Sequence, residues 1–121
     1  MTETEKLERI FKALAADARI RIVQLLKGRV LCVGALAARL NVSQAAVSQH
    51  LRLLRDADLV VPERRGYFIH YRLNERTVAK WKSAAEKLLS VEEPKASSAC
   101  AKACKRKETG HVRCAKRLRE T

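Results

Sequence analysis

The stretch that decides the fold is "NVSQAAVSQHLRLLRDADLV", residues 41–60. Its apolar residues Val47, Leu51 and Leu54 recur at i, i+4 and i+7, the spacing of one stripe along an α-helix. Ser43 stands just before this pattern, and its hydroxyl can accept from the free backbone N–H groups of a first helical turn. The stretch therefore predicts a helix that begins after Ser43 and packs inward along one face.

The opposite face of this predicted helix has side chains suited to reading DNA. Gln can pair with adenine, Arg with guanine or phosphate, and Ala can meet a thymine methyl group. A shorter helix predicted over residues 33–40 precedes it after a tight turn, and such a pair is typical of a helix-turn-helix. Taken alone, the pattern also fits an ordinary amphipathic surface helix. The candidate DNA-contacting residues are Ser43, Gln44, Ala45, Ser48, Gln49 and Arg52.

A predicted β-hairpin follows in "LVVPERRGYFIHYRLN". Two runs rich in β-forming residues, 59–64 and 67–73, flank Arg65-Gly66, and Gly66 supplies the positive φ of a tight turn. Arg64 and Arg65 would project from the tip, where they can reach phosphates or a minor groove. A solvated turn with incidental arginines is the alternative. A hairpin directly after such a helix is a wing, which favours DNA binding.

Helical spacing of apolar residues predicts the other elements. A first helix is expected over residues 6–14, a second with Asp17 as N-cap that ends before Gly28, and a last one over residues 75–91. The fold class is therefore mainly α with a small β-hairpin, a winged helix-turn-helix. The first and last helices leave more apolar surface than a small domain can cover, which indicates a homodimer.

Composition restricts the partners of the chain. Its 121 residues carry a formal net charge of +13 and a pI near 10.2, which favours a polyanion such as nucleic acid or an acidic membrane surface. No apolar run approaches the roughly 18 residues of a spanning helix, and the start "MTETEKLE" does not resemble a signal peptide. We therefore expect a soluble, cytoplasmic protein that does not enter a membrane.

The composition changes at "SVEEPKASSA", which predicts a folded domain over residues 1–92 and a basic, cysteine-rich tail over residues 93–121. From residue 95 onward, nine lysines and arginines stand against two glutamates. The chain has no phosphate-binding glycine loop, no plausible Ser/His/Asp set and no paired carboxylates beside a pocket. We therefore do not expect an enzyme.

Three segments resemble the ArsR/SmtB family of winged-helix repressors: "FKALAADARIRIVQLL", "LCVGALAARLNVSQAAVSQHLRLLRDADLV" and "ERRGYFIHYRL", within residues 7–74. The resemblance implies a homodimer, joined mainly through the first and last helices, that binds a twofold-symmetric operator. It also implies an inducer that binds the protein and weakens DNA binding. A constitutive winged-helix protein without an inducer is the alternative.

The inducer sites of the family are only partly present. Arsenic-sensing members often carry Leu-Cys-Val-Cys-Asp-Leu, but here the stretch reads "LCVGAL": Cys32 matches the first thiol, while Gly34 and Ala35 replace the second thiol and the aspartate. We interpret Cys32 as a small buried hydrophobic residue rather than a ligand. Zinc-sensing members use Asp and His pairs on the last helix, where this chain has no histidine. His50 and His70 are interpreted as structural or close to DNA.

The tail segment "SACAKACKRKETGHVRCAK" holds three of the four cysteines. Cys100 and Cys104 are four residues apart, so a helix would place them on one face. Gly110 can break that helix and let the chain return Cys114 toward the pair, with His111 three residues before it. The neighbouring lysines and arginines favour thiolate over thiol. The tail is therefore the candidate inducer site.

Two sets of ligands compete in this tail. Three thiolates suit As(III) or Sb(III), whereas adding His111 gives a Cys3His set that suits Zn(II) or Cd(II). A thiol-redox or persulfide sensor is a further alternative, although relatives of that kind pair a cysteine near the position of Cys32 with one on the last helix, where this chain has none. Some arsenic-responsive members resemble it in using a C-terminal cysteine cluster. We therefore expect a repressor of arsenic-resistance genes released by As(III) or Sb(III).

Overall fold

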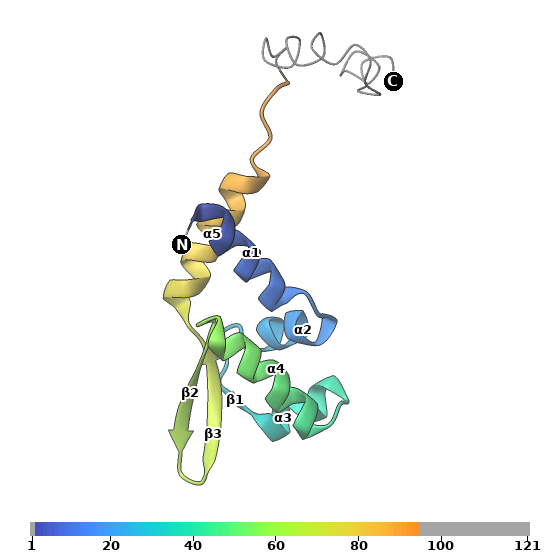
Figure 1. Ribbon diagram of the computed structural model, residues 1–121. Coiled ribbons are helices and arrows are strands. Elements are labelled where there is room, and N and C mark those ends of the chain that lie inside the picture. The colour runs from blue at the N-terminus through green and yellow to red at the C-terminus, as the bar shows by residue number, and fades with distance from the viewer. Residues whose placement is uncertain (1, 95–121) are drawn as a thin grey trace. The chain divides into compact units, whose positions relative to one another are not determined.

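The computed structural model describes residues 2–94, and its helices and strands belong to the first of two units, Met1–Ser90 (Figure 1). The fold is mainly helical with a small antiparallel sheet, which confirms the predicted class. The elements in chain order are α1 (Glu3–Leu14), α2 (Asp17–Leu25), β1 (Leu31–Cys32), α3 (Val33–Leu40), α4 (Gln44–Asp56), β2 (Val60–Arg65), β3 (Phe68–Leu73) and α5 (Glu75–Leu89).

The helix ends follow local capping chemistry. Thr2 and Glu5 form a reciprocal capping box at the start of α1. The prediction that Asp17 caps α2 is wrong: Ala16 is the N-cap and makes no side-chain bond, while Asp17 is the first helical residue. The negative charge of Asp17 in the first turn still stabilises α2, because the N-terminal end of the helix dipole is positive. As expected, α3 ends before Asn41, which adopts a left-handed φ of 57°.

Helix α4 is built as its sequence predicts. Ser43 is the N-cap, and its Oγ accepts from the Ala46 backbone N–H at 3.1 Å. The stripe of Val47, Leu51 and Leu54 is buried, with at most 1% of each side chain exposed. Burying three such side chains contributes several kcal/mol in total at about 1.5–3 kcal/mol each. The rest of this core cluster comes from α2, α3, β2 and the adjoining loops: Ile22, Leu26, Leu36, Ala37, Leu40, Leu59 and Val60.

The sheet has the strand order β1-β3-β2, and both pairings are antiparallel. The hairpin turn lies one residue later than predicted, because Arg65 still belongs to β2 and pairs with Phe68. The two turn residues are therefore Gly66 and Tyr67, and Gly66 has the expected positive φ, 65°. Strand β1 was not predicted, since two residues are too few to show an alternating pattern.

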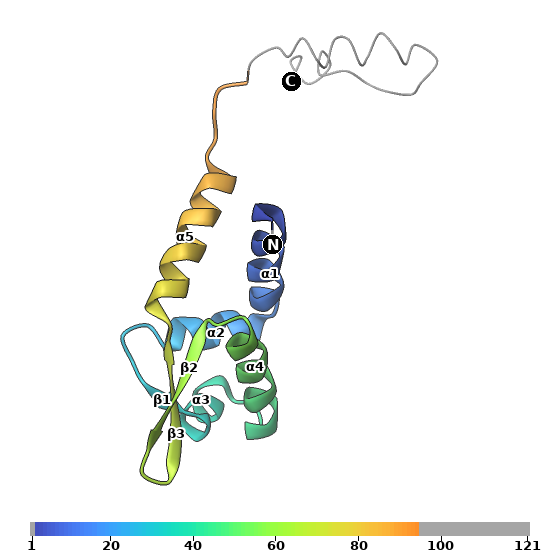
Figure 2. The same cartoon turned by 60° about the vertical axis from the view of Figure 1, so that its left-hand side comes forward.

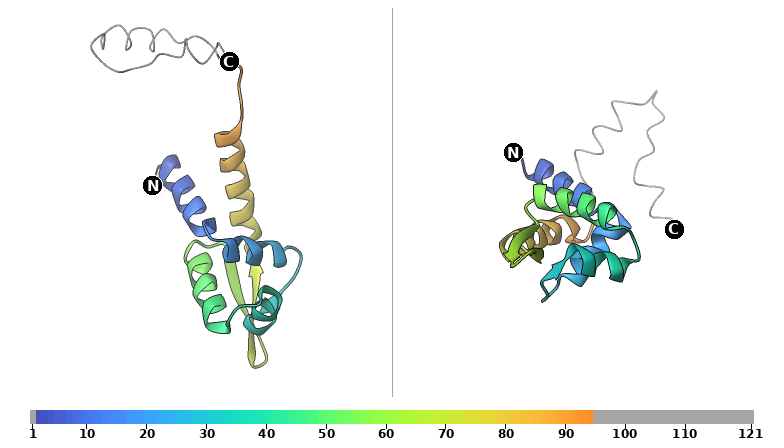
Figure 3. Two further views of the ribbon diagram at one scale, coloured as in Figure 1. Left: turned by 90° about the vertical axis from the view of Figure 1, so that its right-hand side faces the viewer. Right: turned by 90° about the horizontal axis from the view of Figure 1, so that it is seen from below.

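Helices α1 and α5 contact each other and lie at the end of this unit opposite the hairpin turn (Figures 2 and 3). Large apolar side chains on both helices stay exposed: Phe11 by 43%, Leu88 by 53% and Leu89 by 68%. Among residues 2–94, no helix has both the length and the apolar character needed to cross a membrane.

Candidate nucleic-acid interface

The N-cap and the outward face of α4 present six of the eight predicted DNA-contacting residues to solvent. Each is exposed: Ser43, Gln44, Ala45, Ser48, Gln49 and Arg52. The buried stripe on the opposite face fixes the rotation of the helix, so these side chains cannot turn inward without exposing Val47, Leu51 and Leu54. Their contact with bases or phosphates stays a prediction.

The hairpin turn and the N-terminal end of α4 lie at the same end of the unit (Figures 1 and 3). Arg64 and Arg65 are exposed next to the turn, as predicted. Arg65 Nη2 lies 3.2 Å from Glu63 Oε2, so part of its charge is already paired. Within residues 2–94, Arg64 makes no ion pair. In this arrangement, α4 can enter one groove of a DNA duplex while the basic hairpin lies beside it.

The two histidines in this region have different surroundings. His50, half-buried on α4, meets Arg19 of α2 with 3.4 Å between Nδ1 and Nη1. His70 lies on β3, where its buried Nδ1 has no hydrogen-bond partner among the described residues. The contact of His50 supports the structural interpretation, and Arg19 is a residue that sequence reasoning missed.

Cys32 is half-buried, which corrects its interpretation as a simple buried hydrophobic residue. It is the N-cap of α3, and its Sγ accepts from the Ala35 backbone N–H at 3.4 Å. In residues 2–94, no three His, Cys, Asp or Glu side chains form a group that can hold a metal ion. The predicted tail ligands lie outside the described residues, and these are Cys100, Cys104, His111 and Cys114.

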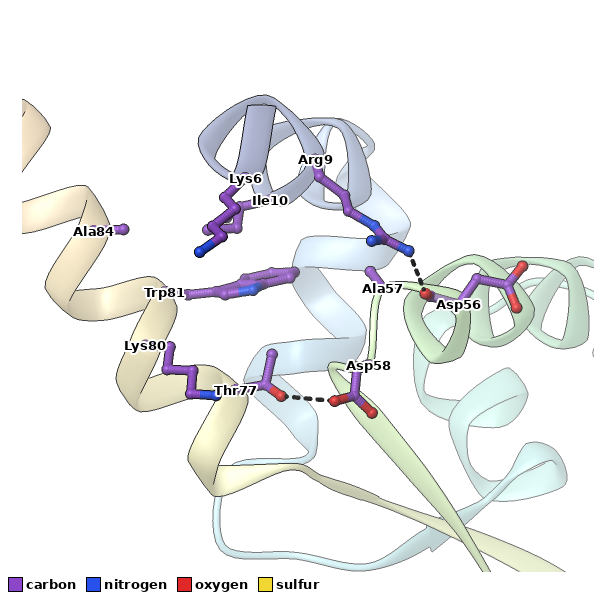
Figure 4. A pocket seen from close by; sticks show the side chains of 10 residues that line it. All are labelled: Lys6, Arg9, Ile10, Asp56, Ala57, Asp58, Thr77, Lys80, Trp81 and Ala84. Carbon is purple, nitrogen blue, oxygen red and sulfur yellow. Dashed lines mark hydrogen bonds between the residues drawn. The ribbon is translucent and has the colours of Figure 1, made fainter. Parts of the chain in front are cut away.

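A cavity of about 310 Å³ separates α1, α5 and the turn after α4 (Figure 4). The indole of Trp81 lies across it (Figure 4). Two hydrogen bonds cross its edges: Arg9 Nη2 donates to the Asp56 carbonyl at 3.1 Å, and Thr77 Oγ1 donates to Asp58 Oδ2 at 3.3 Å. These bonds connect the end of α4 to α1 and α5, and sequence periodicity gave no signal for them.

The comparisons with known proteins agree with this geometry. Residues 17–61, which hold α2 to the start of β2, match the family model described as "Bacterial regulatory protein, arsR family". The transcriptional repressor SdpR of Bacillus subtilis (strain 168) is 37% identical over 68 residues, covering 56% of this chain and 76% of SdpR. The arsenical resistance operon repressor of Escherichia coli (strain K12) is 35% identical over 91 residues, covering 68% of this chain and 78% of that protein.

Solved structures similar to this chain are also ArsR-like and winged helix-turn-helix regulators. An ArsR-like transcriptional regulator from Rhodococcus sp. RHA1 has a TM-score of 0.63 at 29% identity, covering 70% of this chain and 80% of that one. A homodimeric winged helix-turn-helix DNA-binding domain from Mycobacterium bovis has a TM-score of 0.59 at 26% identity, covering 76% and 90%. The fold and the exposed face of α4 thus define a winged helix-turn-helix regulator of transcription. The chain belongs to the ArsR family, is a DNA-binding repressor of the ArsR/SmtB type and is not an enzyme.

Proposed function

We propose that the chain is a homodimeric repressor that binds a twofold-symmetric operator and leaves it when As(III) or Sb(III) binds the tail thiolates. The observation that carries the DNA-binding part is the polar, exposed face of α4 above a fully buried stripe, at the same end of the unit as the two arginines of the hairpin. We refer to α4 as the recognition helix and to the hairpin as the wing. Such a regulator acts where the DNA is, in the cytoplasm.

The dimer part of the proposal is supported by the apolar side chains that α1 and α5 leave in water. Phe11, Leu88 and Leu89 are each between 43% and 68% exposed, and burying them against a second copy would contribute favourably. The related domain from Mycobacterium bovis is homodimeric. Two recognition helices in one dimer can then read two half-sites about one helical turn apart.

The inducer part rests on the donor set in the sequence. Cys100, Cys104 and Cys114 offer three sulfur ligands amid lysines and arginines, which favour the thiolate form. Thiolate ligands select soft, thiophilic ions. The Escherichia coli relative is named an arsenical resistance operon repressor, and we propose arsenic-resistance genes as the targets here. His111 carries the second candidate: with it, the set becomes Cys3His, which suits Zn(II) or Cd(II).

In this scheme, inducer binding acts as an allosteric coupling. The ion ties the three thiols together, and the resulting arrangement of the tail on the dimer fits the DNA-bound spacing of the two recognition helices poorly. A coupling free energy of about 1–3 kcal/mol, which is typical of allostery, is enough to lower operator affinity by roughly 5–150-fold.

The experiment that tests the proposal is fluorescence anisotropy of the reduced, full-length protein on DNA from upstream of its own gene. Arsenite, zinc and a persulfide donor are added separately to the formed complex. We expect release by arsenite, and we expect the triple variant Cys100→Ser, Cys104→Ser, Cys114→Ser to bind DNA normally but to ignore arsenite. An unchanged response in that variant would overturn the tail site, and release by zinc alone would favour the Cys3His set.

Cys32→Ser is the matched control for this experiment. Serine is a good N-cap, so the substitution keeps a side-chain acceptor for the Ala35 N–H at the start of α3. We expect this variant to fold, bind DNA and respond to arsenite as the unchanged protein does. Loss of the response in Cys32→Ser would place the inducer at α3 instead of the tail.

A further inference from the structure

The cavity between α1, α5 and the turn after α4 has a size and a lining that suit a small organic ligand. Its volume of about 310 Å³ lies within the range of about 300–1,000 Å³ that is usual for small-molecule sites. Its apolar lining comes from Ile10, Ala57, Trp81 and Ala84. The indole of Trp81 is half-buried and lies across the cavity, so a planar ring can stack on it (Figure 4). The cavity therefore favours an aromatic ligand.

The charged groups around the cavity favour an anion. Lys6, Arg9 and Lys80 line it, and none of them forms an ion pair within residues 2–94. Two carboxylates also line it, but that of Asp58 already accepts a hydrogen bond from α5, and that of Asp56 points away from the indole (Figure 4). The three cations are thus the groups left to meet a ligand, and a carboxylate is a strong acceptor for them.

Arg9 is the cation best placed to change its partner. Its Nη2 donates to the carbonyl oxygen of Asp56 at 3.1 Å, which is a neutral acceptor at an exposed position. A carboxylate offers a guanidinium two parallel, charge-assisted hydrogen bonds, each roughly twice as strong as a bond between neutral groups. An anion in the cavity would therefore draw Arg9 away from the last residue of α4.

The turn after α4 forms a wall of the cavity that is held in place from two sides. A Schellman motif ends the helix: the Leu59 N–H donates to the Leu54 carbonyl at 2.9 Å, and the Asp58 N–H to the Arg55 carbonyl at 2.8 Å. The left-handed position of this motif usually holds glycine, but here Asp58 adopts a φ of 61°. Unlike glycine, Asp58 has a carboxylate, which accepts from Thr77 Oγ1 at 3.3 Å. The sequence thus tolerates an unfavourable backbone conformation at a residue that fixes the cavity wall to α5.

A second copy of the chain does not have to fill this cavity. Successive residues of an α-helix are about 100° apart, so Phe11 lies on a different side of α1 from Lys6, Arg9 and Ile10. Phe11 is the exposed apolar residue of α1 that we assign to the dimer. A partner that covers Phe11 can therefore leave the side of α1 that lines the cavity free.

We propose that this cavity binds a small aromatic carboxylate, whose ring stacks on Trp81 and whose carboxylate is bound by Arg9, with Lys6 and Lys80 beside it. This ligand is distinct from the thiophilic ion of the tail, so the cavity site goes beyond the proposed function and does not depend on it. Because Arg9 leaves the Asp56 carbonyl when the site is filled, occupancy is linked to the last residue of α4.

The test uses the full-length protein and phenylacetate as the probe. Trp81 is the only tryptophan of the chain, so its fluorescence reports the cavity directly. We expect phenylacetate to change this emission saturably, with a dissociation constant of about 1 mM or lower. Phenylacetamide keeps the ring but has no charge, and cyclohexylacetate keeps the charge but has no aromatic ring. We expect each of them to bind about tenfold more weakly than phenylacetate.

Four variants assign the contacts, with binding measured by isothermal titration calorimetry. We expect Arg9→Gln to weaken phenylacetate binding about tenfold and to abolish its advantage over phenylacetamide. Trp81→Leu should abolish the advantage over cyclohexylacetate. We expect Lys80→Gln to weaken phenylacetate binding as well. Its matched control is Lys82→Gln, because Lys82 is exposed on the same helix but does not line the cavity, and we expect no change there. Each ratio compares two compounds on one variant, so a loss of folded protein does not alter it.

Three results would overturn the cavity site. The first is an emission that phenylacetate leaves unchanged at about ten times the expected dissociation constant. The second is equal binding of all three compounds, which would mean general apolar adsorption. The third is an emission that shifts with protein concentration and not with phenylacetate, because a second copy then fills the cavity. The proposed function is tested separately by arsenite, and we expect the triple cysteine-to-serine variant to bind phenylacetate as the unchanged protein does.

Discussion

Arg19 of α2 contacts His50 of the recognition helix, with 3.4 Å between Arg19 Nη1 and His50 Nδ1. The same guanidinium donates from Nε to the Ala13 carbonyl at 2.8 Å, at the end of α1. Because arginine has no acceptor, His50 Nδ1 must accept this bond, and the ring proton of neutral His50 then sits on Nε2. One side chain of α2 therefore joins the end of α1 to the helix that carries the predicted DNA contacts.

Replacing this side chain is expected to destabilise the fold. Arg19→Met keeps much of the aliphatic volume but removes the donors to Ala13 and His50, so the part-buried carbonyl of Ala13 loses its partner. We expect the free energy of unfolding to fall by about 1–3 kcal/mol, measured by urea denaturation followed by circular dichroism.

Arg21→Met is the matched control, because Arg21 is on the same helix and its side chain makes, within residues 2–94, only an exposed ion pair with Asp17 at 3.9 Å. Exposed pairs contribute at most about 1 kcal/mol, so the control should change stability little. Equal effects of the two substitutions would show that the Arg19 contacts do not stabilise the protein.

The cap of the recognition helix allows stability and DNA affinity to be separated. Ser43→Ala removes the acceptor for the Ala46 N–H, and we expect a loss of about 1 kcal/mol in unfolding free energy. Ser43→Asp keeps an equally good cap but adds a negative charge at the exposed start of α4. We expect normal thermal stability and weaker DNA binding from that variant. Full DNA affinity in Ser43→Asp would mean that this end of the helix lies away from the phosphates.

Recognition-helix geometry was predictable from sequence because its signals are local. The stripe and the cap lie within twelve residues of one another, and the structure confirms both. Strand β1 was missed because its two residues are defined only by pairing with β3, for example Cys32 with His70. The predicted turn was misplaced by one residue, because a positive φ at Gly66 is compatible with both turn positions. Only the pairing of β2 with β3 determines which two residues form the turn.

The contact of Arg19 with His50 joins residues 31 positions apart, so no periodicity in the sequence reveals it. The same holds for the bond between Thr77 and Asp58, which depends on how α5 packs. Cys32 looked like a core residue because a buried cysteine and a capping cysteine have the same sequence neighbourhood. The packing of the elements, rather than a local sequence pattern, determines these two contacts and how far Cys32 is buried.

The ion pair between Glu8 and Lys12 on α1 predicts a small dependence of stability on pH. Lys12, with its Nζ 2.8 Å from Glu8 Oε1, lowers the pKa of Glu8 below its ordinary value of 4.5 through a hydrogen bond and through its charge. A carboxylate whose pKa is depressed on folding stabilises the folded state above the unfolded pKa, and this contribution disappears as the pH falls through the folded pKa.

Glu8→Gln removes this contribution and tests its sign. At neutral pH and low salt, we expect the variant to melt slightly below the unchanged protein, and the two to converge in acid once Glu8 is protonated. Both side chains are exposed, so added salt should also reduce the difference. A difference that grows in acid would contradict the assignment.

The two wing arginines are expected to differ in their effect on DNA binding. Arg65 is partly neutralised by Glu63 at 3.2 Å, whereas Arg64 makes no ion pair in the described part of the chain. Each phosphate contact contributes about one unit to the slope of log K against log salt concentration. We therefore expect Arg64→Ala to lower that slope more than Arg65→Ala does, in anisotropy titrations at several salt concentrations.

Glu63→Gln completes the comparison, because it frees the Arg65 guanidinium and removes a negative charge from the wing. We expect this variant to bind DNA more tightly at low salt and to lose that advantage as salt screens the phosphates. In the double variant Glu63→Gln, Arg65→Ala, the gain should shrink to the part that comes from removing the charge of Glu63 alone. If Arg64→Ala and Arg65→Ala change the slope equally in the presence of Glu63, the ion pair does not restrain Arg65 when DNA is bound.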